Sequence, residues 1–345
     1  MAPLRWGFMG SGKINNDFAT AIDTFSKNEH KKVAVAARKK ASAEAFAKKF
    51  DFEKSYDSYE SLALDADIDI VYIGTVNPNH YELCVLCIEN GKHVLCEKPL
   101  TLRLEHTQKL IKLAEEKGKF FQEAVWSRFF PIYERVRQEL KAGSLGEINL
   151  VTAMFGFNDQ QTARLMRKDL GGSSLMDIGG YTIQFALQVY GPEMPQKVHA
   201  VAIKNVEGID MSVAITLQWK GGQIAQLTSS FLAKLDSSAQ IWGQSGSLEV
   251  HEPFWCPEEM TLKGKTEKHP LPMVKHDLEF RNGQGMVYEV QEVKRCIDNG
   301  LTESPHFTHK ETLIIAQIAD EVKKQIGLSF EEIYSGDKEK WKESV

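Results

Sequence analysis

The first 126 residues alternate short apolar runs with helical patterns, and this alternation constrains the fold more than any other feature of the sequence. The predicted strands are Arg5–Met9, Lys32–Ala37, Ile68–Thr75, His93–Glu97 and Phe120–Ala124. The predicted helices between them are Lys13–Ser26, Ala41–Phe50, Pro78–Asn90 and Leu102–Lys117. Such alternation is typical of βαβ units and of a parallel sheet that is buried on both faces. Residues 1–126 are therefore predicted to form a doubly wound α/β domain that binds its ligands outside the carboxyl ends of the strands.

The apolar pattern changes after about residue 145. Between Met211 and Trp219 apolar and polar residues alternate strictly, which predicts a strand with one buried face in an open antiparallel sheet. Further predicted strands are Ile148–Phe157, Val198–Lys204, Gln223–Phe231, Ala239–Trp242 and Ser247–His251, and the predicted helices are Gly172–Tyr190 and Met286–Asn299. Residues 127–330 are thus predicted to form a C-terminal α+β domain on an open, mostly antiparallel sheet. The charged residues 331–345 are predicted to be a flexible tail.

The composition excludes several classes of protein. Of the 345 residues, 42% are hydrophobic and 26% are charged, which is typical of globular proteins and not of disordered chains. The chain has 42 Lys and Arg against 47 Asp and Glu, and the net charge of −5 argues against nucleic-acid binding. No run approaches the roughly 18 apolar residues of a membrane span. The first residues also lack the pattern of a cleaved signal peptide.

The cysteines indicate a reducing compartment. Their number is five and their spacing is irregular, which does not suit a disulfide framework, so we expect the cytosol. Cys84 and Cys87 lie inside a predicted helix, with no second pair at zinc-like spacing. We predict that both are small buried side chains, and no metal site is expected.

A glycine-rich segment, GFMGSGKIN (Gly7–Asn15), ends the first predicted strand and opens the first predicted helix. In this context the backbone N–H groups of the turn and of the helix N-terminus face a pyrophosphate, which is the signature of a Rossmann dinucleotide site. Asn15 occupies the third glycine position, where a small residue normally permits close packing of helix and strand. The alternative is a glycine turn without a ligand, and the position between strand and helix argues against it.

Basic residues follow the second predicted strand. Arg38, Lys39 and Lys40 stand where an acidic residue would bind the ribose 2′-hydroxyl of NAD. Arg38 offers a guanidinium fork for a 2′-phosphate, so NADP is the predicted dinucleotide. The alternative is a solvated basic turn.

Lys98 follows the fourth predicted strand in the segment Glu97-Lys98-Pro99. It is expected at the carboxyl edge of the sheet, where a substrate would lie. Beside a positively charged nicotinamide its ammonium would lose basicity or lower the pKa of a neighbouring phenol. The alternative is a surface lysine paired with Glu97.

Asp177 and Tyr181 are four residues apart on a predicted helix and therefore share one face. Between them lie Gly179 and Gly180, each of which costs roughly 1 kcal/mol relative to alanine in a helix, and this suggests that a cofactor approaches the backbone closely. The alternative is that Tyr181 is a core residue and that Asp177 is solvated or caps the helix.

Other candidates have weaker signals. His80 follows the third predicted strand at the ligand edge of the sheet, but it would serve equally well as a capping or packing residue. Six aromatic residues are mostly expected in the core, although those in loops are able to line an apolar pocket. They are Trp126, Phe129, Phe130, Phe155, Trp255 and Phe280.

The motifs GFMGSGKI, CEKP and DIGGY resemble those of the glucose–fructose oxidoreductase (Gfo/Idh/MocA) superfamily. The segments LRWGFMG, VAVAAR, GKHVLCEKPL, EAVWSRFFP, DIGGYTIQF, EPFWCP and FRNGQGMVYE occur in order over about residues 3 to 328. Together they resemble the dimeric dihydrodiol dehydrogenases, also described as NADP-dependent D-xylose dehydrogenases. The sequence departs from the mammalian pattern at Lys39-Lys40 and at Ser42, where a second arginine is expected, and this leaves the strength of NADP selection open. It also departs in the loop Asn158–Asp169, which leaves the substrate open.

The resemblance implies roles for individual residues. Lys98 and Tyr181 would be the catalytic pair, with Asp177 beside them. The predicted cofactor-binding residues are Gly10, Ser11, Gly12, Lys13, Ile14, Arg38, Asn77, His80, Glu97 and Lys98. The predicted substrate pocket consists of Trp126, Phe155, Trp255 and Phe280. Family members pair through the open sheet of the second domain, so a homodimer is expected.

The predicted function is NADP-dependent oxidation of a hydroxyl of trans-dihydrodiols or of pyranose sugars such as D-xylose. Tyr181 would be the general acid–base, and Lys98 together with the oxidised nicotinamide would lower its pKa from about 10. Two alternatives stay open: another sugar or inositol dehydrogenase on the same scaffold, and a non-catalytic NADP-sensing regulatory protein. The presence of both Lys98 and Tyr181 argues against the sensor.

Overall fold

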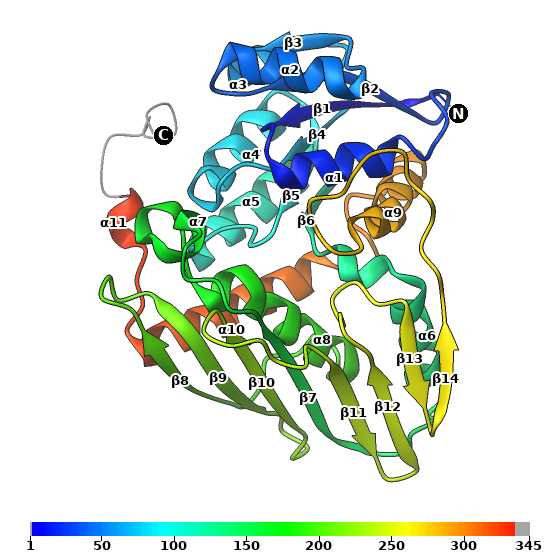
Figure 1. Cartoon of the computed structure of the whole chain (residues 1–345), viewed down its shortest axis with the longest axis vertical. Coiled ribbons are helices and arrows are strands. Elements are labelled where there is room, and N and C mark those ends of the chain that lie inside the picture. Colours follow the sequence, from blue (N-terminus) through cyan, green and yellow to red (C-terminus); the bar gives the residue numbers. More distant parts are fainter. Residues whose placement is uncertain (1, 335–345) are drawn as a thin grey trace.

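Six parallel strands form the sheet of the N-terminal part of the chain. The structure is a computed structural model, and it describes residues 2–334. The strands are β1 (Leu4–Met9), β2 (His30–Ala36), β3 (Lys54–Tyr56), β4 (Ile70–Ile73), β5 (His93–Glu97) and β6 (Phe121–Ala124). Their spatial order, β3-β2-β1-β4-β5-β6, is that of the Rossmann fold, so the predicted doubly wound sheet is confirmed (Figure 1).

Helices cover both faces of this sheet, because its strands are apolar on both sides. They are α1 (Lys13–Ile22), α2 (Lys40–Phe50), α3 (Tyr59–Leu64), α4 (His80–Glu89) and α5 (Leu104–Lys117). Side chains of α1 and α2 share one core with Trp6 and Phe8, whereas α3, α4 and α5 share a second core with Met9 and Val71. The sequence prediction missed β3, since this strand has three half-buried residues and no apolar run.

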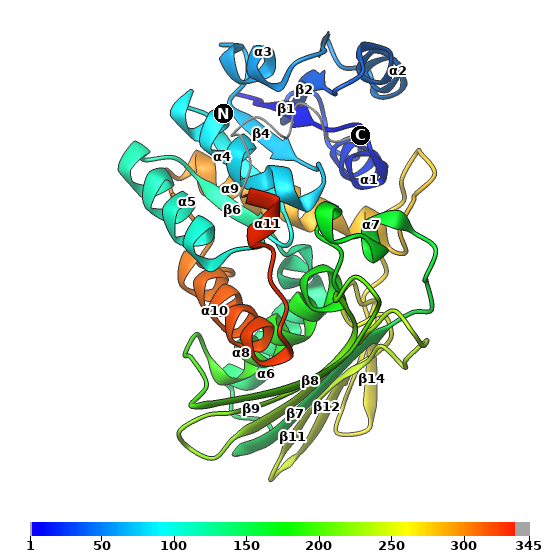
Figure 2. The same cartoon turned by 90° about the vertical axis from the view of Figure 1, so that its left-hand side faces the viewer.

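An eight-stranded sheet forms the second layer (Figure 2). Its strands are β7 (Ile148–Gly156), β8 (Lys197–Lys204), β9 (Asp210–Gln218), β10 (Ile224–Ser230), β11 (Ala239–Gly243), β12 (Gly246–Val250), β13 (Glu259–Leu262) and β14 (Lys265–Lys268). In the order β14-β13-β12-β11-β7-β10-β9-β8 all neighbours are antiparallel except β7 and β10. The predicted open, mostly antiparallel sheet is therefore confirmed.

The helices of the second part lie on the inner face of this sheet, between it and the Rossmann sheet (Figures 1 and 2). They are α6 (Pro131–Lys141), α7 (Ala163–Met166), α8 (Gly180–Tyr190), α10 (His309–Ile326) and the short α11 (Glu331–Tyr334). The sequence prediction did not include α6 or α10. A signal for α10 was present, because Thr308 and Glu311 form a reciprocal capping box at its start.

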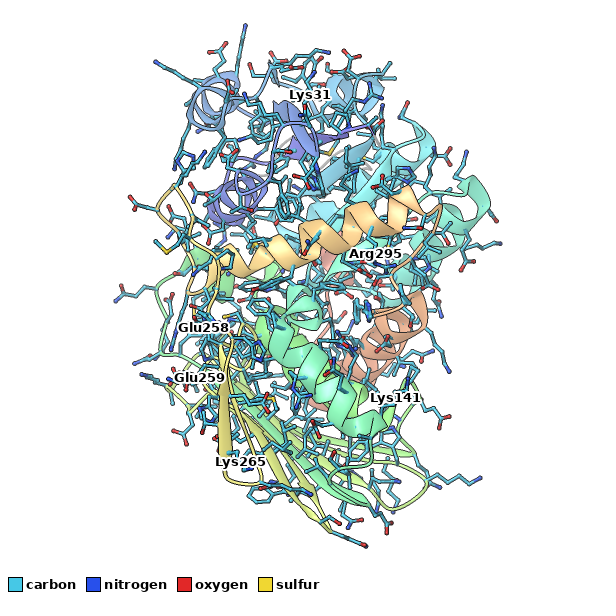
Figure 3. All side chains as sticks on the ribbon, turned by 90° about the vertical axis from the view of Figure 1, so that its right-hand side faces the viewer. Lys31, Lys141, Glu258, Glu259, Lys265 and Arg295 are labelled. Atoms are coloured by element: carbon cyan, nitrogen blue, oxygen red, sulfur yellow. The ribbon has the colours of Figure 1, made fainter. Side chains whose placement is uncertain are left out.

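The helix α9 (Val287–Asp298), predicted from the sequence as Met286–Asn299, returns from the second part of the chain to the first. It packs against α1, and Val290 and Val293 belong to the same hydrophobic core as Trp6 and Phe18. Figure 3 shows α9, which carries Arg295, running along the side of the molecule between the two sheets.

The domain boundary at residue 126 stays a prediction. The tail predicted for 331–345 lies outside the described residues except for α11.

The cysteines are all unpaired and buried. Cys84 and Cys87 have no exposed surface, which confirms that they are packed as small core side chains. No helix within residues 2–334 is long and apolar enough to cross a membrane.

Candidate active site

The glycine loop lies between β1 and α1, as predicted. Gly10 has a φ of +107°, and a Cβ at this position would lie 2.7 Å from the carbonyl oxygen of Gly74, so only glycine fits. Gly12 precedes α1 and supplies no side-chain cap, which leaves N–H groups of the first helical turn for another partner. This cradle fits the pyrophosphate of a dinucleotide. The residues that would hold it are Gly10, Ser11, Gly12, Lys13 and Ile14.

Asn15 explains how the loop does without its third glycine. Its side chain is fully buried, and its amide contacts the backbone of Met9 and Gly12 at 3.4 Å and 3.3 Å. A Cβ on Gly74, directly after β4, would lie only 2.7 Å from the amide atoms of Asn15. The small residue that close packing requires is therefore on the strand side of the contact and not on the helix.

The other predicted cofactor residues follow neighbouring strands at the same edge of the sheet. Arg38 is exposed just beyond β2, Asn77 follows β4, and Glu97 and Lys98 lie at the end of β5. Asn77 and Glu97 are each 6% exposed. The carboxyl ends of parallel strands meet at one edge, so these residues border the place that a dinucleotide held by the glycine loop would occupy.

His80 lies at the ligand edge of the sheet, as predicted, whereas Phe280 lies in a loop beside α1. His80 is fully buried, with Nδ1 2.9 Å from the Pro99 carbonyl and Nε2 3.2 Å from the Thr75 carbonyl. It joins two loops through both ring nitrogens, which fits the packing alternative, and its contact with a cofactor stays a prediction. Phe280 is 40% exposed, and its backbone N–H donates to the carboxylate of Asp17 on α1.

Lys98, Asp177 and Tyr181 converge, although they come from different parts of the fold. The Nζ of Lys98 donates to the backbone carbonyl of Asp177 at 2.8 Å and to its Oδ1 at 3.3 Å. The same Nζ lies 5.3 Å from the ring centroid of Tyr181. The ammonium of the Rossmann part and the phenol of the second part thus meet at one cleft.

An aromatic wall surrounds the phenol. The indole Nε1 of Trp126 donates to the Tyr181 hydroxyl at 2.7 Å. Phe155 lies 5.8 Å from the Tyr181 ring and stacks on Trp255 at 3.7 Å between centroids. Three of the four predicted pocket residues are therefore together, whereas Phe280 has no ring contact with them among the described residues.

The turn that carries Asp177 is held by a second buried carboxylate. Asp210 on β9 accepts from the hydroxyls of Ser173 and Ser174 at 2.6 Å and 2.8 Å and from the N–H of Leu175 at 2.7 Å. The predicted helix consequently begins with a π-helical turn, Leu175–Gly179, before α8.

The two glycines of this helix have different surroundings. A Cβ on Gly179 would lie 3.4 Å from the hydroxyl of Ser229 on β10, so the sheet approaches this glycine within the protein itself. Gly180 has open space beside it and lines a small cavity of about 40 Å³ with Lys98, Tyr181 and the buried Glu123. The close approach of a cofactor to Gly180 stays a prediction, whereas Gly179 is explained by contacts within the protein.

Sequence reasoning missed Arg164. This residue of α7 donates from Nη1 to Asp177 Oδ1 at 2.6 Å and from Nη2 to Oδ2 at 3.4 Å. It lies in the loop that the sequence singled out only because it departs from the mammalian pattern. A single arginine in a polar loop carries no spacing signal, and only the fold places it on Asp177.

The electrostatics assign different protonation states to these groups. Burial alone would raise the pKa of Asp177, but Lys98 and Arg164 together lower it to about 2, so its carboxyl is ionised at neutral pH. Burial raises the pKa of Tyr181 well above its ordinary value, and the Trp126 hydrogen bond offsets this only in part. Burial therefore favours the protonated phenol at neutral pH. The lowering predicted from Lys98 together with the oxidised nicotinamide stays a prediction, and within the protein Nζ of Lys98 donates to Asp177.

The comparisons with known proteins match this architecture. Residues 4–125 match a family model described as an oxidoreductase family with an NAD-binding Rossmann fold, and residues 133–249 match the GFO/IDH/MocA C-terminal domain. Trans-1,2-dihydrobenzene-1,2-diol dehydrogenase of Xenopus tropicalis is 38% identical over 326 residues, which are 94% of this chain and 99% of that protein.

Two solved structures share the fold at lower identity. Levoglucosan dehydrogenase in complex with NADH and levoglucosan has a TM-score of 0.83 at 20% identity and covers 94% of this chain and 97% of its own. A 3-ketoreductase from Actinomadura kijaniata in complex with NADP and TDP-benzene has a TM-score of 0.78 at 24% identity and covers 94% and 98%.

The geometry predicts that Asp177→Asn destabilises the fold. The substitution leaves the ammonium of Lys98 and the guanidinium of Arg164 without their shared counter-ion. A folded pKa of about 2 against an ordinary 3.8 corresponds to about 2 kcal/mol, present at neutral pH and lost as the pH falls from 3.8 towards 2. Urea unfolding at pH 7.5 measures the change.

The matched control is Asp169→Asn, because Asp169 also pairs with an arginine, Arg167, but both side chains are more than half exposed. An exposed pair contributes at most about 1 kcal/mol. Equal losses in the two variants would show that the buried pairing of Asp177 does not stabilise the fold.

Proposed function

The chain belongs to the GFO/IDH/MocA oxidoreductase family, and we propose that it oxidises a hydroxyl of trans-dihydrodiols and of pyranose sugars such as D-xylose with NADP. The observation that supports this most is the convergence of Lys98, Asp177 and Tyr181 beside an aromatic wall at the carboxyl edge of the Rossmann sheet. The name of the Xenopus tropicalis relative supports a cyclic diol as substrate.

The cofactor would lie on the glycine loop with its reactive end towards Lys98. When bound, it supplies the hydride acceptor for oxidation and the hydride donor for reduction. The loop Gly10–Ile14 would hold the pyrophosphate, and the ends of β4 and β5 would position the remainder at the edge of the sheet.

Tyr181 would transfer the proton. In oxidation the substrate hydroxyl loses its proton to the phenolate oxygen, and in reduction the phenol returns a proton to the carbonyl oxygen. Trp126 donates to the same oxygen, and this hydrogen bond stabilises the phenolate relative to the phenol. Because the tyrosine is 6% exposed, bulk water does not compete for the proton once a substrate covers it.

Lys98 and Asp177 would orient the substrate rather than exchange protons with it. Asp177 is ionised at neutral pH and keeps Lys98 in place through both its carboxylate and its carbonyl. The ammonium has three donors, so one is left for the oxygen of the reacting carbon. The flat faces of Phe155 and Trp255 would pack against the ring of a diol or sugar.

Tyr181→Phe should lower kcat by about 100- to 10,000-fold, because the proton acceptor is lost while the ring remains. The affinity for NADPH should stay within about twofold of the wild type. Initial rates with a trans-dihydrodiol, D-xylose, D-glucose and inositol measure the loss, and fluorescence titration measures NADPH binding. In the wild type the raised pKa predicts that oxidation accelerates with rising pH, whereas reduction slows.

Tyr190→Phe is the matched control, since this tyrosine lies on the same helix and its hydroxyl bonds only to the Ile224 carbonyl among the described contacts. Near-normal turnover by Tyr181→Phe would refute the assigned role. A wild-type protein that binds NADPH but turns over no member of the panel would favour the sensor.

The preference for NADP over NAD rests on Arg38. Its exposed position just beyond β2 supports contact with a 2′-phosphate. Arg38→Ala should lower kcat/KM for NADP by about 10- to 100-fold, the value of a charge-assisted hydrogen bond, and leave NAD nearly unchanged. Lys48→Ala, an exposed lysine at the far end of α2, is the control. An equal loss with both cofactors would contradict the assignment.

We also propose a homodimer through the uncovered face of the eight-stranded sheet. Val201 and Ile203 on β8 and Trp242 on β11 are 71%, 60% and 44% exposed, and alternate residues of these strands face the core. Light scattering should give twice the mass of one chain, and Ile203→Glu should return the mass of a single chain. A single-chain mass for the wild type would refute the dimer.

The proposed location is the cytosol. All five cysteines are unpaired in the structure, which supports a reducing compartment. Cell fractionation tests this location.

A further inference from the structure

Arg164 lies in a loop that spans the cleft between the two sheets. The loop leaves β7, carries α7 and the short turn Lys168–Leu170, and reaches the Rossmann part, where a Cβ on Gly171 would lie 3.1 Å from Cβ of Asn77. Both cartoon views place α7 between the Rossmann sheet and the eight-stranded sheet (Figures 1 and 2). The arginine is thus held over the same cleft as Lys98.

Only part of the guanidinium is used by the protein. Nη1 and Nη2 each donate to one oxygen of Asp177, whereas Nε has no hydrogen-bond partner within residues 2–334. A guanidinium has five N–H donors in a planar fork, so about three remain free. The side chain is 40% exposed although its anchor, Asp177, is only 7% exposed. Free donors on a partly exposed group beside a buried anchor are available to a ligand.

The two cations at the site have more hydrogen-bond donors than Asp177 can accept. Two cations, Lys98 and Arg164, share the single carboxylate of Asp177. Both have hydrogen-bond donors left over and neither offers an acceptor, so the cleft has surplus donors. A substrate that presents two adjacent oxygens would satisfy donors on both cations at once.

We propose that Arg164 is a specificity-determining residue that donates to the hydroxyl next to the one being oxidised, so that the site selects vicinal diols and sugars over isolated alcohols. In this arrangement Lys98 and Tyr181 contact the reacting oxygen, and Asp177 fixes the distance between the two cations. The inference rests on the proposed function and adds the group that recognises the second oxygen.

The test removes the arginine and, separately, the oxygen that it would bind. Arg164→Met keeps the aliphatic stem but has no donors, and Arg164→Lys keeps the charge but has no fork. Each variant and the wild type are assayed with a cyclic trans-1,2-diol and its mono-alcohol, and with D-xylose and its 2-deoxy counterpart. Where a deoxy compound is not oxidised, it is tested as a competitive inhibitor of diol oxidation, and its inhibition constant is compared between the variants in place of kcat/KM.

For the diol and for D-xylose, kcat/KM should fall by about 10- to 100-fold in Arg164→Met, chiefly through a higher KM, since a hydrogen bond to a charged group is lost. The deoxy compounds should change by less than about threefold, and Arg164→Lys should be intermediate. Arg167→Met is the matched control, because Arg167 lies three residues further along the same loop and pairs with the exposed Asp169. Thermal unfolding and NADPH titration of every variant check the fold and the cofactor site.

Equal losses with and without the second hydroxyl would overturn the inference, because Arg164 would then act only by positioning Asp177. Weaker NADPH binding would also overturn it and would assign the arginine to the cofactor. Unchanged kinetics in Arg164→Met would also overturn the inference, because Arg164 would then form only an ion pair with Asp177 and contact no substrate. A wild type that oxidises none of the substrates would instead refute the proposed function, and this inference with it.

Discussion

The carboxylate of Asp177 is the contact on which the rest of the site depends. It lies in the π-helical turn before α8, and it binds Lys98 from the end of β5 and Arg164 from the cleft-spanning loop. A charge this deeply buried is tolerated only with paired partners, so the three segments hold one another in place. Asp210 on β9 holds the same turn by accepting hydrogen bonds from two serines and a backbone N–H. Two buried acids thus determine where the neighbouring phenol points.

In this arrangement the charge of Lys98 and the protonation of the Tyr181 phenol are set by different neighbours. The ammonium of Lys98 lies near the tyrosine ring, but its charge is directed at Asp177 and burial dominates the pKa of the phenol. A neutral phenol is suited to donating a proton, whereas accepting one needs additional positive charge in the cleft or a higher pH. The direction of the reaction is therefore coupled to what else occupies the site.

Much of this could be read from the sequence, for physical reasons. Apolar runs and glycine turns depend on local geometry, so the Rossmann sheet, the loop at Gly10 and the open second sheet were predicted. Lys98 and Tyr181 were found because each stands at a fixed place in a recognisable motif. The complete burial of His80 and the path of the loop that carries Phe280 could not be predicted, because both depend on packing between segments that are far apart in the chain. Arg164 was missed because its partner, Asp177, is thirteen residues away and lies in a π-helical turn, which no sequence spacing predicts.

The return of α9 to the N-terminal half affects how the chain folds during synthesis. Helix α1 buries Phe18, Ala19 and Ile22 in a core that also contains Val290 and Val293. On the ribosome the Rossmann strands emerge long before residue 287, so the contacts between α1 and α9 form only after most of the second half has been translated. Domains generally fold as units in order of synthesis, and exposed apolar surface at that stage favours aggregation. The hydrophobic core around α1 is therefore completed by a helix from the far end of the chain, and the two halves do not finish folding independently of one another.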